Sequence, residues 1–209
     1  MKVILVRHGK TPGNLEKRYV GRTDEHLSEV GKKELAERVL QNSFPSVDAL
    51  LVSPMIRCRE TSSIIYNDIV AGGIMVIEPE LREMDFGAFE YKNFKELDGD
   101  PEYQAYLDSG GFRNFPGGEM LKDFENRCVE GFIRGIGNVA DQFMKGKQAE
   151  GKSIDQSQMT IGVVAHGGTI MALMNRFCTT KKTYYEWMLD NGAFYVCEWT
   201  GETLCWQDE

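Results

Sequence analysis

The feature that most constrains the fold is the alternation of short apolar runs with stretches long enough to form helices. The runs VILV, ALLV, IMVI and TIGVVA occupy residues 3–6, 49–52, 74–77 and 160–165. Each run has the length and the aliphatic, often β-branched composition of a buried strand. Strands separated by helix-length segments are typical of a largely parallel sheet, so the pattern predicts an α/β fold.

Helices are expected between these strands. Apolar residues recur close to helical spacing in LSEVGKKELAERVLQN, although Gly31 argues against an early start of that helix. After the second apolar run, Ser53 followed by Pro54 predicts an N-cap and a first helical position. A further helical pattern follows PGGEM, with apolar residues at Leu121, Phe124, Cys128, Phe132 and Ile136.

The 209-residue chain is predicted to form a single domain, residues 1–209, with a cap-like insertion at about 86–120 that is rich in aromatic and acidic residues. Residues 145–158 are polar and are predicted to be a surface loop or a frayed helix end. The last segment predicts a hairpin that turns at Gly201 and Glu202.

Composition narrows the class of protein. A formal net charge of −8 argues against nucleic-acid binding, which requires a basic face. The five cysteines show no metal-ligand spacing and suggest reduced thiols in a cytoplasmic protein without a metal. The first apolar run is too short for a signal peptide or a membrane span. The oligomeric state is open, with a homodimer as one outcome.

Two of the three histidines have matching surroundings. Arg7 and His8 end the first apolar run and precede Gly9, while His166 ends the last run and precedes Gly167. In parallel α/β sheets, ligands bind outside the carboxyl ends of the strands. If the two strands are neighbours, His8 and His166 are therefore expected to face each other across one cleft.

Two further groups are predicted at the same edge of the sheet. Arg57 follows the second apolar run and Glu83 follows the third. Guanidinium groups neutralise phosphate oxygens, and a neutral imidazole can attack phosphorus. The collected side chains therefore suit phosphoryl transfer without a metal ion.

The segments LVRHGKTPGN, SPMIRCRET, ELREMDFGAFE and VVAHGG, taken together and in this order, resemble the histidine phosphatase superfamily, also called the phosphoglycerate mutase-like family. The resemblance implies a three-layer α/β/α sandwich with a mostly parallel central sheet and an inserted helical cap segment. It also implies a phosphohistidine intermediate and no cofactor.

The resemblance implies a role for each catalytic candidate. His8 would be the nucleophile, and Arg7, Arg57 and His166 would form the pocket for the transferring phosphoryl group. Glu83 would donate a proton to the leaving oxygen and then accept one from water. These roles require a neutral His8, whereas His166 would help most as a cation. An anionic substrate would favour a protonated Glu83.

Other positions are assigned by the same comparison. Asn14 would hydrogen-bond the phosphoryl group, Gly21 would line the entrance of the site, and Gly167 would bring backbone close to it. Asp85 is the main rival of Glu83 for the acid role. Lys10 is expected either to add a cation near the phosphate or to be solvated, with neither alternative favoured.

Three functions are compatible with these residues: a metal-independent phosphomonoesterase acting on a small phosphorylated metabolite, a phosphoglycerate mutase, and a non-catalytic phosphate-binding module. The complete set of candidate catalytic residues disfavours the module. Mutase-type sequences continue RHG with Glu, where this chain has Lys10. FGAFE followed by PGGE resembles the α-ribazole and broad-specificity phosphatase branch, where FGxWEG is typical; here Phe89 replaces Trp and Tyr91 replaces Gly.

Overall fold

The computed structural model describes residues 1–151 and 155–206. Its centre is a six-stranded sheet with the strand order β3-β2-β4-β1-β5-β6. The strands are β1 (Lys2–Arg7), β2 (Ala49–Val52), β3 (Ile74–Ile77), β4 (Thr160–Ala165), β5 (Phe194–Trp199) and β6 (Leu204–Trp206). β1 to β4 are mutually parallel, whereas β5 runs antiparallel to β1 and β6 runs antiparallel to β5. All four apolar runs are strands, which confirms the predicted α/β fold.

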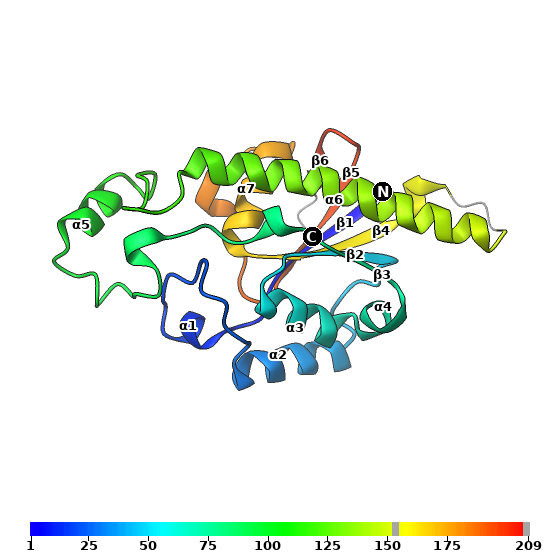
Figure 1. Ribbon diagram of the computed structural model, residues 1–209, viewed down its shortest axis with the longest axis horizontal. Coiled ribbons are helices and arrows are strands. Elements are labelled where there is room, and N and C mark those ends of the chain that lie inside the picture. Colours follow the sequence, from blue (N-terminus) through cyan, green and yellow to red (C-terminus); the bar gives the residue numbers. More distant parts are fainter. Residues whose placement is uncertain (152–154, 207–209) are drawn as a thin grey trace.

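Helices cover both faces of this sheet and complete three layers (Figure 1). On one face lie α6 (Leu121–Ala149) and α7 (Gly167–Phe177); on the other lie α2 (Glu29–Leu40), α3 (Ile56–Ile65) and α4 (Asn67–Gly72). The remaining helical elements are α1 (Pro12–Leu15), α5 (Pro101–Asp108) and the 3₁₀ turns η1 (Pro79–Leu81), η2 (Gly87–Phe89), η3 (Gln156–Gln158) and η4 (Tyr184–Trp187).

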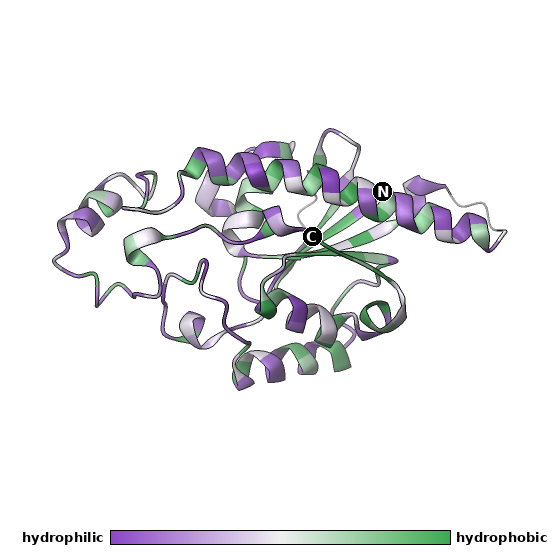
Figure 2. Ribbon diagram, viewed as in Figure 1, coloured by the Kyte–Doolittle hydropathy of each residue, from purple (hydrophilic) through white to green (hydrophobic). Residues whose placement is uncertain are grey.

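The central strands are apolar on both faces, as a covered parallel sheet requires. Along β1, Val3 and Leu5 join the core formed with α6 and α7, while Ile4 and Val6 join the core beneath α3. This division follows from the two-residue period of a strand, which sends successive side chains to opposite faces. Figure 2 shows the strands in green, with purple and green alternating along α6.

The structure corrects the expected cap of α3. The helix begins at Ile56 with Met55 as its N-cap residue, and no side chain caps it. The Ser53 hydroxyl instead contacts Nε2 of His166 at 2.7 Å. Ser53 and Pro54 therefore precede the helix, and the predicted N-cap at Ser53 is wrong because this hydroxyl is used in the site described below.

The sequence predicted a surface loop or frayed helix end over residues 145–158 and a hairpin in the last segment. The helix α6 continues to Ala149, so the first part of residues 145–158 is helical, while residues 152–154 lie outside the described residues. β5 and β6 pair antiparallel around Gly201, whose φ of +102° requires glycine-like freedom. The predicted hairpin is therefore confirmed.

Gly31 lies inside α2 despite the low helix propensity of glycine, because the packing at this position requires a residue without a side chain. Ser28 caps this helix through a bond from the Gly31 N–H, and the Ser28 hydroxyl also donates to the carbonyl of Lys10. This arrangement brings the Lys10 backbone against the helix, so that a Cβ on Gly31 would lie 2.2 Å from the Lys10 oxygen. The helix consequently starts at Glu29, earlier than Gly31 suggested.

Substituting Gly31→Ala is therefore expected to destabilise the protein by about 1–3 kcal/mol, because overpacking outweighs the better helix propensity of alanine. Gly137→Ala in α6 is the matched control, since a Cβ there meets nothing within 4 Å. The control should stabilise by about 0.5–1 kcal/mol. Urea denaturation measures both values, and a stabilised Gly31→Ala variant would contradict this explanation.

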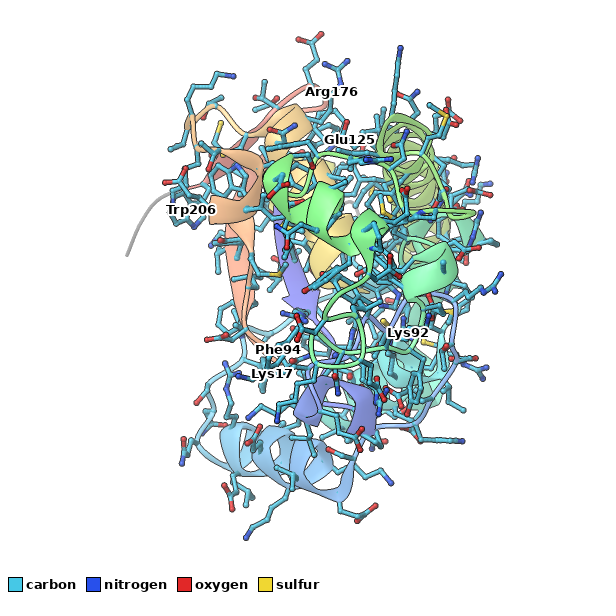
Figure 3. All side chains as sticks on the ribbon, turned by 90° about the vertical axis from the view of Figure 1, so that its left-hand side faces the viewer. Lys17, Lys92, Phe94, Glu125, Arg176 and Trp206 are labelled. Atoms are coloured by element: carbon cyan, nitrogen blue, oxygen red, sulfur yellow. The ribbon has the colours of Figure 1, made fainter. Side chains whose placement is uncertain are left out.

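Residues 86–120, here called the cap segment, lie at one end of the sheet together with α1 (Figure 1). Figure 3 looks onto this end, where a backbone bridge between Arg18 and Asn93 is flanked by Lys17 and Phe94. The cap segment has its own apolar cluster against α6 and α7, whose cap members are Phe89, Leu97, Tyr106 and Phe115. These residues therefore stabilise the cap segment by packing against the two helices.

Candidate active site

A cavity of about 330 Å³ opens between the cap segment and the carboxyl ends of the parallel strands. Its floor contains Arg7 and His8 from the end of β1, together with Gly167 and Gly168 at the start of α7. Its outer wall contains aromatic side chains of the cap segment and of η4, namely Phe86, Tyr106, Phe115, Tyr184 and Tyr185. The site therefore combines a polar floor with an outer chamber that is partly aromatic.

The two histidines lie side by side, as predicted, but only His8 lines the cavity, so no cleft separates them. β1 and β4 are adjacent parallel strands with Arg7 opposite Ala165, so the residues that follow each strand emerge side by side. The ring centroids of His8 and His166 lie 5.2 Å apart. The backbone N–H of His8 also donates to the Ala165 carbonyl at 3.0 Å, which continues the pairing beyond the sheet.

His8 is held in the form that a nucleophile needs. Its Nδ1 lies 2.7 Å from the Gly9 carbonyl, which can only accept, so Nδ1 carries the proton and Nε2 has a free lone pair. Burial lowers the pKa of His8 well below its ordinary value, and the charges of Arg57 and Arg7 lower it further. The ring is therefore neutral at physiological pH.

His166 is fixed by two contacts that also define its tautomer. Arg57 Nε donates to Nδ1 of His166 at 3.3 Å, so the ring proton resides on Nε2 and is donated to the Ser53 hydroxyl. Burial lowers the pKa of His166 well below its ordinary value, with Arg57 and His8 adding to the shift. The expectation of a cationic His166 is wrong for this state, because both histidines are buried beside arginines.

The two arginines occupy different layers. Arg7 lines the cavity, donates from Nη1 to the Leu189 carbonyl at 2.5 Å, and has a buried Nε with no hydrogen-bond partner. Arg57 is fully buried against His166 and donates to the carbonyls of Gly21 and Thr23. Neither Arg57 nor His166 lines the cavity. Of the two arginines that were predicted to hold the phosphoryl group, Arg7 therefore faces the cavity directly.

Glu83 lines the same cavity as His8 and is 9% exposed. Its carboxyl oxygens accept from the N–H groups of Met84 at 2.9 Å and of Gly168 at 3.0 Å. Burial raises the pKa of Glu83, against the opposing effect of these hydrogen bonds and of Arg57 and Arg7. The rival residue Asp85 accepts from Gly87 N–H and does not line the cavity, so the geometry favours Glu83 as the acid.

The residues predicted to contact substrate have different positions. Asn14 and Gly167 line the cavity. Gly21 does not; a Cβ there would lie 2.0 Å from the Met84 carbonyl, so this glycine permits a close backbone approach beside Arg57. Lys10 forms an ion pair with Glu34 at 2.8 Å and lies outside the cavity lining, which favours the solvated alternative.

Sequence reasoning missed several residues that support the site. Asn191 donates to the His8 carbonyl and to Oδ1 of Asn14, each at 3.1 Å, and the Thr61 hydroxyl accepts from Gly9 N–H at 3.0 Å. Both lie far along the chain from the residues they hold. Sequence spacing carried no signal for Asn191, whereas Thr61 is the final residue of the SPxxRxxxT pattern.

Among residues 1–151 and 155–206, no cluster of three or more His, Cys, Asp or Glu side chains is arranged to hold a metal ion. Within the same residues, no helix combines the length and apolarity needed to cross a membrane.

The sequence pattern of the histidine phosphatase superfamily (branch 1) matches residues 3–207 of this chain. The chain belongs to the histidine phosphatase superfamily. Its match covers both histidine strands and the segments that carry Arg57 and Glu83.

Similar proteins within this superfamily have different activities in their names. A 2,3-bisphosphoglycerate-dependent phosphoglycerate mutase of Methylorubrum extorquens (strain PA1) is 29% identical over 178 residues, which cover 82% of this chain and 76% of the relative. The α-ribazole phosphatase from Shigella flexneri has the same fold, with a TM-score of 0.74, 21% identity and coverage of 99% and 95% of the two chains. A phosphoglycerate mutase from Thermus thermophilus gives a TM-score of 0.62 at 26% identity, covering 98% and 96%.

One departure from the FGxWEG pattern of the α-ribazole and broad-specificity phosphatase branch has a conformational consequence. Tyr91, which stands in place of Gly, has a φ of +60°, a left-handed conformation that costs a non-glycine residue about 1–2 kcal/mol. Contacts on several sides hold it there: its N–H donates to the Tyr19 carbonyl, its hydroxyl donates to Glu25, and Arg18 stacks on its ring. Phe89, in place of Trp, is fully buried.

Proposed function

We propose that this histidine phosphatase hydrolyses a small phosphomonoester through a phosphohistidine on His8, without a metal ion. The observation that carries the proposal is the hydrogen bond from His8 Nδ1 to the Gly9 carbonyl, which leaves the Nε2 lone pair free in a cavity that is also lined by Arg7, whose buried Nε has no partner. An unpartnered buried N–H is costly unless it meets an acceptor, and phosphate oxygens supply one. Glu83 lines the same cavity and supplies the proton.

The reaction has two balanced steps. The lone pair of His8 Nε2 forms a bond to phosphorus, the ester P–O bond breaks, and the leaving oxygen takes the proton of Glu83. Water then attacks phosphorus and gives its proton to the Glu83 carboxylate, while the P–N bond breaks and its electron pair returns to Nε2. The products are the alcohol and inorganic phosphate, and the enzyme regains its starting state.

The charges around the outer chamber support hydrolysis rather than the mutase reaction. A phosphoglycerate carries a carboxylate besides its phosphate and needs a second cationic group. Arg18 and Arg113 line the chamber, but Arg18 is paired with Glu16 and Glu96, and Arg113 is paired with Glu102. The aromatic side chains of the wall instead suit an ester with an uncharged, apolar body.

The proposal predicts that the wild-type protein, with EDTA present, has at least about 10-fold higher kcat/KM for an aryl phosphate such as 1-naphthyl phosphate than for 3-phosphoglycerate. Phosphate release measures hydrolysis, and interconversion of phosphoglycerates with catalytic bisphosphoglycerate measures mutase activity. Interconversion without phosphate release would establish the mutase alternative, and a protein inactive on every ester would support the binding module.

We also infer a cytoplasmic location from the cysteines, which are unpaired among the described residues.

A further inference from the structure

Arg127 on α6 is a largely buried arginine that does not line the cavity. It forms hydrogen bonds to the chain segment that carries Glu83, which does line the cavity. All five N–H donors of a guanidinium group find acceptors here. Nε and one N–H of Nη2 donate to the two carboxyl oxygens of Glu119, at 2.6 and 2.7 Å. Nη1 donates to the carbonyls of Glu80 and Arg82, each at 2.8 Å, and Nη2 donates to the carbonyl of Glu83 at 3.0 Å.

These three carbonyls belong to the segment that carries Glu83. This segment leaves η1 and enters the cap segment outside any strand or α-helix, so regular backbone pairing does not fix it. Arg127 binds the backbone of this segment, while the N–H groups of Met84 and Gly168 bind the side-chain carboxyl of Glu83. The position of the carboxyl in the cavity therefore depends on both sets of bonds.

We propose that Arg127 is a positioning residue that holds Glu83 at the leaving-group oxygen and couples it to the cap segment. The coupling runs through Glu119, which belongs to the cap segment and donates its own N–H to the Asp85 carbonyl at 3.0 Å. The inference rests on the proposed function, because it assumes that Glu83 is the general acid. Lysine cannot replace Arg127, since an ammonium has three donors and lacks the planar fork.

The test compares esters that differ in their need for an acid. A p-nitrophenyl phosphate has a good leaving group and needs little protonation, whereas an alkyl phosphate needs it. Arg127→Lys and Arg127→Met are expected to lower kcat/KM for the alkyl ester by about 10–100-fold and for the aryl ester by less than about 3-fold, a partial loss of the roughly 10²–10⁴-fold that an acid supplies. Glu119→Gln should show the same selectivity with a smaller loss.

Arg134→Met is the matched control. Arg134 lies two helical turns further along α6 and pairs with the buried carboxylate of Glu78, so its loss also leaves a buried glutamate unpaired. It should affect both esters equally. Thermal unfolding of each variant shows which ones fold, and Arg127→Lys carries the test if Arg127→Met does not.

A double-variant cycle completes the experiment. If Arg127 acts through Glu83, then Arg127→Lys combined with Glu83→Gln loses no more activity on the alkyl ester than Glu83→Gln alone. Equal losses on both esters, or additive losses in the double variant, would overturn the positioning role. A wild-type protein that releases no phosphate from either ester would refute the proposed function itself, and the positioning role with it.

Discussion

Replacing His8 with alanine is expected to lower the turnover of every phosphomonoester by at least about 10⁴-fold, because the phosphoryl group then has no acceptor on the enzyme. His8 is fixed for this role by the Gly9 carbonyl and by a lowered pKa that keeps Nε2 unprotonated. Rapid quenching of the wild type with ³²P-labelled substrate should trap a label on the protein that is stable in base and labile in acid, as expected of a phosphohistidine. The alanine variant should trap none.

His26→Ala is the control for this experiment. Its ring is largely exposed, pairs with Glu60 and lies outside the cavity lining, so turnover should change by less than about 2-fold. A His8→Ala variant that keeps its turnover, or that still traps the label, would show that another residue accepts the phosphoryl group.

Glu83→Gln is expected to reduce kcat/KM for alkyl phosphates by about 10²–10⁴-fold, with a much smaller effect on p-nitrophenyl phosphate. It should also remove the alkaline limb of the pH profile. Because burial raises the pKa of Glu83, the acid stays protonated above the usual range of a carboxyl group, and wild-type activity should fall as pH rises through that raised pKa. An unchanged alkaline limb in the variant would assign the acid role to another group.

The same shift makes a prediction about stability. A carboxyl group whose pKa is raised by folding lowers the free energy of unfolding when it is ionised. This destabilisation is absent below the pKa of the unfolded state and is complete above the pKa of the folded state. Glu83→Gln should therefore increase the free energy of unfolding at neutral pH and flatten its decline from acid to neutral pH. Urea denaturation at several pH values measures this, and a less stable variant at neutral pH would contradict the assignment.

The loss of activity at acidic pH is expected to reflect the protonation of His8. Since burial and the neighbouring arginines lower the pKa of His8 well below its ordinary value, kcat/KM should persist below the usual titration range of histidine and fall only when His8 becomes protonated.

The strands, the α/β class and the superfamily could all be predicted from the sequence, since apolar runs and the spacing of Arg7, His8, Arg57, Glu83 and His166 are local properties of the chain. The sequence also predicted that Arg7, His8 and His166 lie at one edge of the sheet, because parallel strands place their carboxyl ends there. That the two histidine strands are neighbours came only from the structure.

Features that depend on contacts between distant segments required the three-dimensional structure. Ser53 contacts His166 instead of capping a helix, and Gly31 fits within α2 because the Lys10 backbone packs against it. Arg57 contacts His166 and lies outside the cavity lining. The charge state of His166 is set by burial beside Arg57, which no local pattern reveals. Burial and long-range hydrogen bonding are properties of the packed chain, so the electrostatics of the site and the clamp of Arg127 on the Glu83 segment became visible only in three dimensions.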